Sequence, residues 1–176
     1  MRDTIVRDTF MKKTVIKKTH PFIDTGIYKL LLDRSPVCTV DVILFNKDKT
    51  KTLLFKRTNP PIKNKYFSLG GRMHKTEDFV ECAVRQVKKE IGLIIHPKKL
   101  VTGGFANEIH DKSIFKGVTY HCVDIYYGYI LNDREINSIK LDSQHNDYKW
   151  FGVNDKKLHP YMKLKIDTLL KNWTGR

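Results

Sequence analysis

The sequence predicts an α/β (α+β) fold, a sandwich in which a mixed central sheet lies between helices. Three observations support this fold class. Apolar, β-branched runs of strand length recur, two stretches have helical periodicity, and no repeat or low-complexity stretch interrupts them. Strands and helices in this order are typical of a sheet covered by helices. With 176 residues, 40% of them hydrophobic, the chain can build one domain around a proper core.

The N-terminal stretch 1–20 alternates charged and apolar residues without a clean period, so we treat it as an extension of unknown role. Residues 21–176 are expected to form a single domain. Its first helix is predicted over 24–32 and ends before Pro36. Three apolar side chains of this helix are expected to face inward: Ile27, Leu30 and Leu31.

A β-hairpin is predicted next. Residues 37–45 are β-branched and apolar, which indicates a buried strand, and the polar run 46–49 is a turn. Residues 51–57 form the partner strand, and 58–65 form a loop that contains Pro60-Pro61.

Three further strands are predicted in the second half of the chain: 100–107, 118–130 and 149–152. The segments beside them are expected to be loops or turns: 108–117, 132–133 and 141–148. Asn154 is expected to cap a short helix. The last element is an amphipathic helix over 162–173, whose inward side chains are Leu164, Leu169 and Trp173.

The most informative stretch is the glycine pair Gly70-Gly71, followed by a predicted helix from Thr76 to Gly92. Thr76 suits the N-cap and Gly92 the C-terminal cap. Apolar residues recur at every fourth position and form one buried stripe: Phe79, Ala83, Val87 and Ile91. Polar residues are expected on the other side: Arg85, Gln86, Lys89 and Glu90. A glycine turn beside a carboxylate lets the backbone approach phosphates and a metal ion closely.

This spacing resembles the Nudix box, with seven matching residues: Gly71, Glu77, Arg85, Val87, Glu90, Gly92 and Leu93. The resemblance implies a Nudix-type α/β/α sandwich, and we expect Glu77 and Arg85 to brace the loop and helix through an ion pair. Gln86 and Lys89 stand where the box has glutamates that hold further cations. A lysine ammonium would repel a second cation at close range, so we expect one metal ion.

Two further stretches resemble the GDP-mannose mannosyl hydrolase branch of the Nudix superfamily: 56–61 and 142–150. The spacing from Phe22 to Asp41 is similar as well. The resemblance implies Mg²⁺-dependent hydrolysis of a GDP-hexose at the sugar C1, which gives GDP and free hexose with inversion. It also implies a homodimer in which N-terminal segments complete the partner's nucleotide site.

The resemblance implies a role for each matching residue. The Gly70 carbonyl, Glu90 and Gln144 would hold one Mg²⁺, an ion that prefers oxygen ligands. His145 would be the general base, because its unperturbed pKa of about 6.5 lies near neutral pH.

The remaining roles concern the substrate. Arg57 and Arg72 would bind the diphosphate and stabilise the charge that grows on it as the bond breaks. The sugar would contact Asp41, whose carboxylate would be costly in an apolar strand without such a role. The guanine nucleotide would lie against three residues: Phe22, Ile23 and Tyr28.

One departure concerns the sugar contacts. Cys122 stands where the family has a tyrosine, and Tyr120 is the candidate replacement, expected on a different face of the strand. GDP-glucose or another NDP-hexose therefore stays open beside GDP-mannose. His110, in the predicted loop 108–117, is a further candidate for a sugar contact.

Two rival functions stay open. One is a standard Nudix pyrophosphatase that cleaves the diphosphate itself. The other is a non-catalytic Nudix domain that binds a nucleotide or RNA, which the net charge of +14 would favour. The lysines are scattered over the whole chain, however, so we favour steering of a phosphorylated small molecule over nucleic acid as the partner.

The composition also bears on location. No run of about 18 apolar residues predicts a membrane span, and no apolar stretch of secretory type follows the basic N-terminus. The three cysteines are widely spaced in apolar surroundings and are expected to be reduced: Cys38, Cys82 and Cys122. We therefore expect a cytoplasmic protein.

Overall fold

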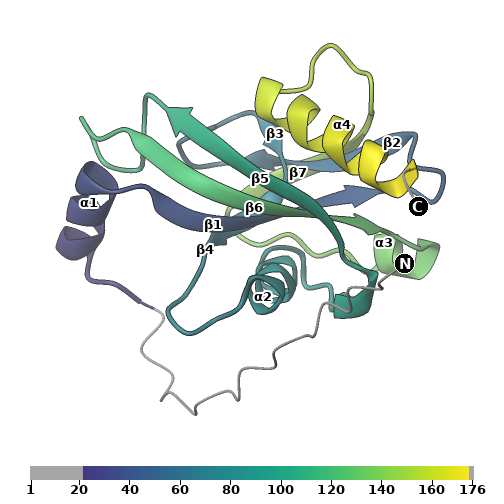
Figure 1. The fold of residues 1–176 in the computed structure, drawn as a ribbon, viewed down its shortest axis with the longest axis horizontal. Coiled ribbons are helices and arrows are strands. Elements are labelled where there is room, and N and C mark those ends of the chain that lie inside the picture. Colours follow the sequence, from purple (N-terminus) through teal and green to yellow (C-terminus); the bar gives the residue numbers. More distant parts are fainter. Residues whose placement is uncertain (1–21, 175–176) are drawn as a thin grey trace, which may run out of the picture.

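The computed structural model describes residues 22–174 (Figure 1). The stretch 1–20, which the sequence analysis treated as an extension, lies outside the described residues. A seven-stranded mixed sheet forms the centre, with the path β3-β2-β1-β6-β5, while β4 pairs with β1 and β7 with β2. Only the β1–β6 pair among these strands is parallel. The predicted sandwich with a mixed sheet is confirmed.

The strands are β1 (Val37–Phe45), β2 (Lys51–Arg57), β3 (Tyr66–Phe67), β4 (Leu69–Arg72), β5 (Val101–His110), β6 (Tyr120–Ile130) and β7 (His145–Gly152). The helices are α1 (Thr25–Arg34), α2 (Phe79–Ile91), α3 (Asp133–Asn137) and α4 (Pro160–Thr174), with a 3₁₀ turn at Pro97–Lys99. Neither α4 nor any other helix within residues 22–174 combines the length and apolar composition that a bilayer-spanning segment requires.

The sheet buries both of its faces, with α4 above it and α2 below it in Figure 1. Side chains of β1 alternate between the two layers because successive residues of a strand point to opposite faces. Val40, Val42 and Leu44 join the core under α2. Ile43 and Phe45 join the core under α4. Asp41 lies two residues before Ile43 on the same strand, so its side chain also faces α4.

Helix α2 begins later than predicted. Asp78, not Thr76, is the N-cap, and its side chain forms a capping box with Glu81. Thr76 has a φ of +69°, so it lies in the turn before the helix. The predicted C-terminal cap is confirmed, since Gly92 adopts the left-handed conformation.

The buried stripe of α2 is shifted from the prediction. Ala83, Val87 and Ile91 are fully buried, but Phe79 is 45% exposed. Gln86 and Glu90, expected on the outer side, are also buried, because this flank of the helix packs towards the glycine strand β4. The polar residues of the helix are therefore divided between solvent and the interior.

Helix α1 presents a different face from the one predicted. Its expected inward residues are exposed: Ile27, Leu30 and Leu31. Instead Tyr28 and Leu32, one turn apart, pack against Val118 and Cys122. A short helix packed mainly through one end leaves its other apolar residues in solvent.

Several later boundaries also differ. Strand β5 extends to His110, so Glu108 and His110 lie on a strand and not in a loop. Strand β7 already begins at His145. Asn154 lies in a turn without a following short helix, whereas α3 forms where only a turn was expected.

The C-terminal helix is confirmed, and of its three predicted inward residues Leu169 and Trp173 face the core, whereas Leu164 does not. Leu164 is 52% exposed, while Leu169 is buried and Trp173 packs on the core. The buried positions are Met162, Lys165, Ile166 and Leu169. This spacing is the regular helical one, and it places a lysine on the inward face. All three cysteines are free thiols; Cys82 and Cys122 are buried, but Cys38 is exposed.

Candidate active site

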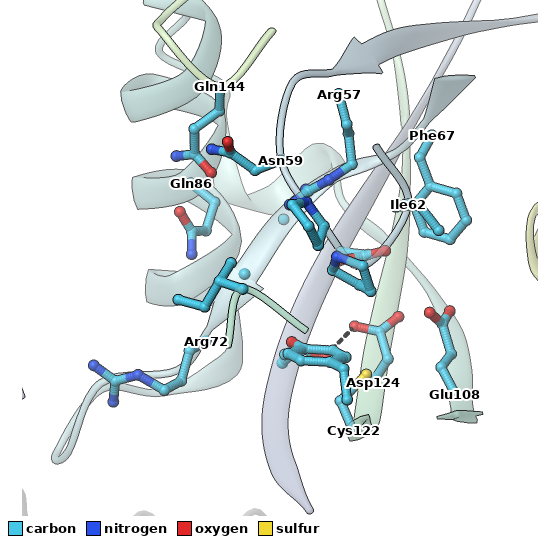
Figure 2. Close-up of a pocket in the computed structure, with 18 of the residues that line it drawn as sticks. Arg57, Asn59, Ile62, Phe67, Arg72, Gln86, Glu108, Cys122, Asp124 and Gln144 are labelled. Atoms are coloured by element: carbon cyan, nitrogen blue, oxygen red, sulfur yellow. Dashed lines mark hydrogen bonds between the residues drawn. The ribbon is translucent and has the colours of Figure 1, made fainter. Parts of the chain in front are cut away.

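A cavity of about 450 Å³ opens at one end of the sheet (Figure 2). Helix α1, strands β1, β4, β5 and β6, helix α2 and the loop after β2 all contribute to its wall. Figure 2 shows the amides of Asn59, Gln86 and Gln144 on one side and the carboxylates of Glu108 and Asp124 on the other. The cavity wall therefore carries neutral amides on one side and carboxylates on the other.

The glycine pair of β4 permits close packing at the cavity wall. Gly70 pairs with Asp41 of β1, and a Cβ added to Gly70 would lie 2.0 Å from the Asp41 Oδ1. A Cβ on Gly71 would lie 2.4 Å from the Gln86 Nε2. Gly70 requires glycine, because a Cβ there would also lie 2.6 Å from the Val40 carbonyl oxygen, whereas a larger residue at position 71 would displace the Gln86 amide.

Behind this strand, Glu90 and His145 form a buried pair. The His145 Nε2 lies 3.6 Å from the Glu90 Oε2, and its Nδ1 lies 3.2 Å from the Asp142 Oδ1. Burial raises the pKa of Glu90 to about 8. Burial also lowers the pKa of His145 below its ordinary value. Nearby positive charge therefore does not offset the burial of the Glu90 carboxylate, and His145 is neutral at physiological pH.

The surroundings of Glu90 fit a divalent cation. A carboxylate that is 1% exposed is costly when its near contacts are the Gly70 amide at 3.3 Å and a neutral imidazole. The Gly70 carbonyl and the Gln144 amide, from residues that line the cavity, would add neutral oxygen donors. Carboxylate and carbonyl oxygens are the ligands that Mg²⁺ prefers.

Two arginines carry positive charge to the cavity. The Arg57 Nε is buried and has no hydrogen-bond partner among the described residues. Arg72 donates to the Met73 carbonyl, and its guanidinium lies 5.8 Å from the centre of the Tyr28 ring. Phe22 and Ile23 line the cavity together with Tyr28, so the three residues expected to hold the nucleotide are brought to one place.

The floor of the cavity holds three carboxylates, from Asp41, Glu108 and Asp124. Their oxygens lie within 4.8 Å of one another, and the ammonium of Lys165 contacts all three. Asp41 therefore has a cationic partner, which the sequence analysis did not foresee.

Tyr120 and Cys122 both line the cavity. Being two residues apart on β6, they point to the same face of the strand, which corrects the expectation of different faces. His110, the other candidate for a sugar contact, lines the cavity from the end of β5.

A family model described as NUDIX domain matches residues 36–172. The chain belongs to the NUDIX domain family. The low-salt glycan biosynthesis protein Agl8 of Haloferax volcanii is 24% identical over 143 residues, which cover 81% of this chain and 87% of Agl8.

Solved structures confirm the NUDIX fold. The NUDIX domain of Shewanella oneidensis NrtR, crystallised with ADP ribose, has a TM-score of 0.60 at 17% identity, over 86% of this chain and 99% of that one. A MutT/nudix family protein from Enterococcus faecalis has a TM-score of 0.53 at 19% identity. That match covers 74% of this chain and 57% of the Enterococcus chain.

The NUDIX box of this chain keeps its internal brace. The Arg85 Nε lies 2.5 Å from the Glu77 Oε1, and the Glu77 Oε2 accepts from the His74 amide. Arg85 also donates to the Arg72 carbonyl. The predicted ion pair is present, and it ties the loop between β4 and α2 to the helix.

Eight of the ten residues expected at the NUDIX site line the cavity: Phe22, Ile23, Tyr28, Asp41, Arg57, Gly70, Arg72 and Gln144. Glu90 and His145 lie buried next to them, in contact with each other and with Gly70 or Asp142. Four residues of the site or its surroundings were not predicted to have a role: Glu108, Asp124, Asp142 and Lys165. The signal for Asp124 was the one noted for Asp41, a carboxylate within an apolar strand, and for Lys165 it was a lysine in the apolar period of a helix.

Proposed function

We propose that this NUDIX protein hydrolyses a GDP-hexose, GDP-mannose or GDP-glucose, at the sugar C1 and releases GDP and free hexose. The distribution of charge within the cavity carries this proposal. Arg57 and Arg72 suit a diphosphate, while the floor carboxylates suit a neutral polyhydroxyl group as hydrogen-bond donor. A nucleoside diphosphate sugar has both ends in one molecule.

A single Mg²⁺ would be held by Glu90, Gln144 and the Gly70 carbonyl. When bound, it would neutralise charge on the diphosphate and so improve GDP as a leaving group. Lys89 lines the same cavity where a box glutamate would stand, and its ammonium disfavours a second cation nearby. Weak activation of water at phosphorus leaves the sugar carbon as the favoured point of attack.

His145 is the proposed general base. The Asp142 carboxylate accepts a hydrogen bond when the proton of the neutral imidazole is on Nδ1, which leaves the Nε2 lone pair to take a proton. The Nε2 has no hydrogen-bond partner among the described residues. The side chain has no exposed surface, whereas its neighbour Gln144 lines the cavity, so the proposed reaction requires that water enter from the cavity to the Nε2.

The reaction then balances as follows. Water attacks C1 as its proton passes to the His145 Nε2, and the bond between C1 and the diphosphate oxygen breaks. The electron pair leaves with GDP, where Arg57 and Arg72 stabilise the added charge. Attack from the face opposite the leaving group inverts the anomeric carbon.

The relatives support a nucleotide sugar in general terms. Agl8 is described as a glycan biosynthesis protein, and ADP ribose, bound in the NrtR structure, is a diphosphate joined to a nucleoside and a sugar. A homodimer also belongs to this proposal, because Phe22 lines the cavity yet is 88% exposed. We further propose a cytoplasmic location, in keeping with three free thiols.

Product analysis in ¹⁸O-water tests the reaction. GDP-mannose and GDP-glucose should give GDP, and the label should enter the free hexose. The rival pyrophosphatase would give GMP and a hexose 1-phosphate, with label in phosphate. The rival binding domain would retain RNA or nucleotide tightly without Mg²⁺-dependent turnover. Light scattering of the same preparation measures the dimer.

A further inference from the structure

Lys165 is a buried cation inside the cavity floor. It projects from α4 with no exposed side-chain surface, and its Nζ lies 5.2 Å from the centre of the Phe67 ring. The Nζ is 2.7 Å from the Asp41 Oδ2, 2.5 Å from the Glu108 Oε1 and 2.7 Å from the Asp124 Oδ2. One ammonium therefore serves three carboxylates.

The carboxylates come from three adjacent strands, β1, β5 and β6, and each has a second partner. The Ser68 hydroxyl donates to Asp41, and the Thr39 hydroxyl donates to Asp124. The His110 Nε2 lies 3.4 Å from the Glu108 Oε2. Ser68 and Lys165 both contact the Oδ2 of Asp41, so the hydrogen bonds among the described residues leave its Oδ1, which lies over Gly70, available.

The charge state of the cluster depends on this lysine. Burial alone would lower the pKa of Lys165, but the Asp41, Asp124 and Glu108 carboxylates hold it well above its ordinary value. Burial and the nearby Asp41 raise the pKa of Asp124, which shows that the floor is still short of positive charge. Without the ammonium, these carboxyl groups would take up protons or a cation.

We propose that Lys165 is a positioning residue that sets hexose specificity. Its contacts fix the positions of the three carboxyl groups, so that they accept hydrogen bonds from sugar hydroxyls in one arrangement. It also occupies the place between them that a divalent cation would otherwise take. This inference rests on the proposed function. It identifies the floor of the cavity as the part that distinguishes one hexose from another.

The test compares Lys165→Met with the wild type in two binding measurements, one with GDP and one with GDP-hexose epimers. The affinity for GDP should stay within about twofold, since GDP lacks the group that the floor contacts. The affinity for the preferred GDP-hexose should fall at least about tenfold, because unsatisfied or protonated acceptors no longer match its hydroxyls. The preference between epimers should narrow, with KM changing more than kcat.

A second readout is metal binding. Titration with Mn²⁺, followed by its electron paramagnetic resonance, should show an additional site in Lys165→Met, because the vacated position lies between three carboxylates. Lys163→Met is the matched control, since this partly exposed lysine of α4 pairs with Asp167 outside the cavity. It should change neither epimer preference nor metal stoichiometry.

If Lys165→Met fails to fold, Glu108→Gln keeps the ammonium and the shape of the floor and should shift epimer preference on its own. An unchanged hexose affinity and epimer ratio in folded Lys165→Met, or in Glu108→Gln, overturns the proposal. The proposed reaction fails separately, if the wild type yields GMP from GDP-hexose. In that case the comparison of GDP with GDP-hexose affinity still decides whether Lys165 governs a sugar site.

Discussion

Glu90 combines deep burial with a raised pKa, and this makes the stability of the protein dependent on pH. The native carboxyl keeps its proton up to a pKa of about 8, whereas an unfolded glutamate loses it near 4.5. Between these values the native state binds more protons, so this group lowers the free energy of unfolding as pH rises, by at most about 1.4 kcal/mol per pH unit.

The first prediction follows because Glu90 lowers the free energy of unfolding as pH rises. In EDTA, wild-type Tm should fall relative to that of Glu90→Gln as pH rises from about 5 to about 8. Mg²⁺ should restore wild-type Tm at the upper end and leave Glu90→Gln unaffected. Thermal melts followed by circular dichroism measure both effects. Parallel pH curves for the two proteins, with and without Mg²⁺, would contradict the assignment of Glu90.

Arg57 provides a second prediction at the same scale. Arg57→Ala should lower kcat for GDP-hexose by about 10²–10³-fold, because a charge that stabilises the leaving diphosphate is lost. Arg57→Lys should recover only part, since an ammonium cannot present the planar fork of a guanidinium. Arg34→Ala, which removes an exposed arginine paired with Asp33, is the control and should leave kcat unchanged. Equal losses in all three variants would assign the effect to net charge.

At the level of single residues, the sequence predicts the site better than its chemistry. Asp41 stands out because it interrupts an apolar strand, and the structure places it at the cavity. Its partner Lys165 lies 124 positions away, and only the packing of α4 on the sheet joins them. The burial of His145 likewise depends on β7 beginning at that residue, a boundary that the polar sequence of the 142–150 stretch does not reveal.

Among the elements, α2 carries the side chains on which the proposed choice of bond depends. Gln86 lies against Gly71, and Lys89 lines the cavity one turn from Gln86. Both positions hold glutamate in the Nudix box that the sequence resembles. The helix thus keeps its caps, its brace and Glu90, but carries less negative charge than a helix that binds several cations.

A third prediction tests this helix. The double variant Gln86→Glu, Lys89→Glu should bind a further Mn²⁺ and should release GMP and hexose 1-phosphate from GDP-hexose, because two added carboxylates can hold a cation that activates water at phosphorus. Chromatography of products and ¹⁸O labelling measure the change. Lys88→Glu, an exposed change on the same helix outside the cavity, should leave the products as they are. A double variant that still releases only GDP would show that box charge does not choose the bond.

Helices and strands are predicted correctly where a single sequence pattern dominates the stretch. The apolar runs of β1 and β2, the caps of α2 and the ends of α1 are local features, and their predicted positions hold within a few residues. The predicted inner face of α1 and the inward position of Leu164 in α4 were wrong, because each helix has apolar residues on more than one side. Only the sheet selects Leu32 over Leu31, and Ile166 over Leu164.

For the whole molecule, a high positive net charge is combined with a cavity of mixed charge. The net charge of +14 comes from lysines spread over the chain, so it attracts phosphates from many directions. In the proposed function, the arginines of the cavity bind the diphosphate and the floor carboxylates bind the sugar. Lysines spread over the chain would then attract the substrate, and cavity residues would select it. Salt should therefore affect attraction and selection differently.

The last prediction uses that difference. Raising the salt concentration from about 0.02 M to about 0.5 M should lower kcat/KM for GDP-hexose several-fold and leave kcat nearly constant, because screening weakens long-range attraction more than contacts inside the cavity. Steady-state kinetics over a salt series measure both constants. A surface that serves nucleic acid would show another result, in which RNA competes with GDP-hexose at low salt.

Two charge reversals of equal size locate the effect. Lys75 follows His74, which lines the cavity, whereas Lys47 lies in the turn between β1 and β2 and does not contribute to the cavity wall. Lys75→Glu should lower kcat/KM at low salt by about threefold and lose this effect at high salt, while Lys47→Glu should change it less. Equal effects of the two variants would mean that net charge, and not the field at the cavity mouth, draws the substrate in.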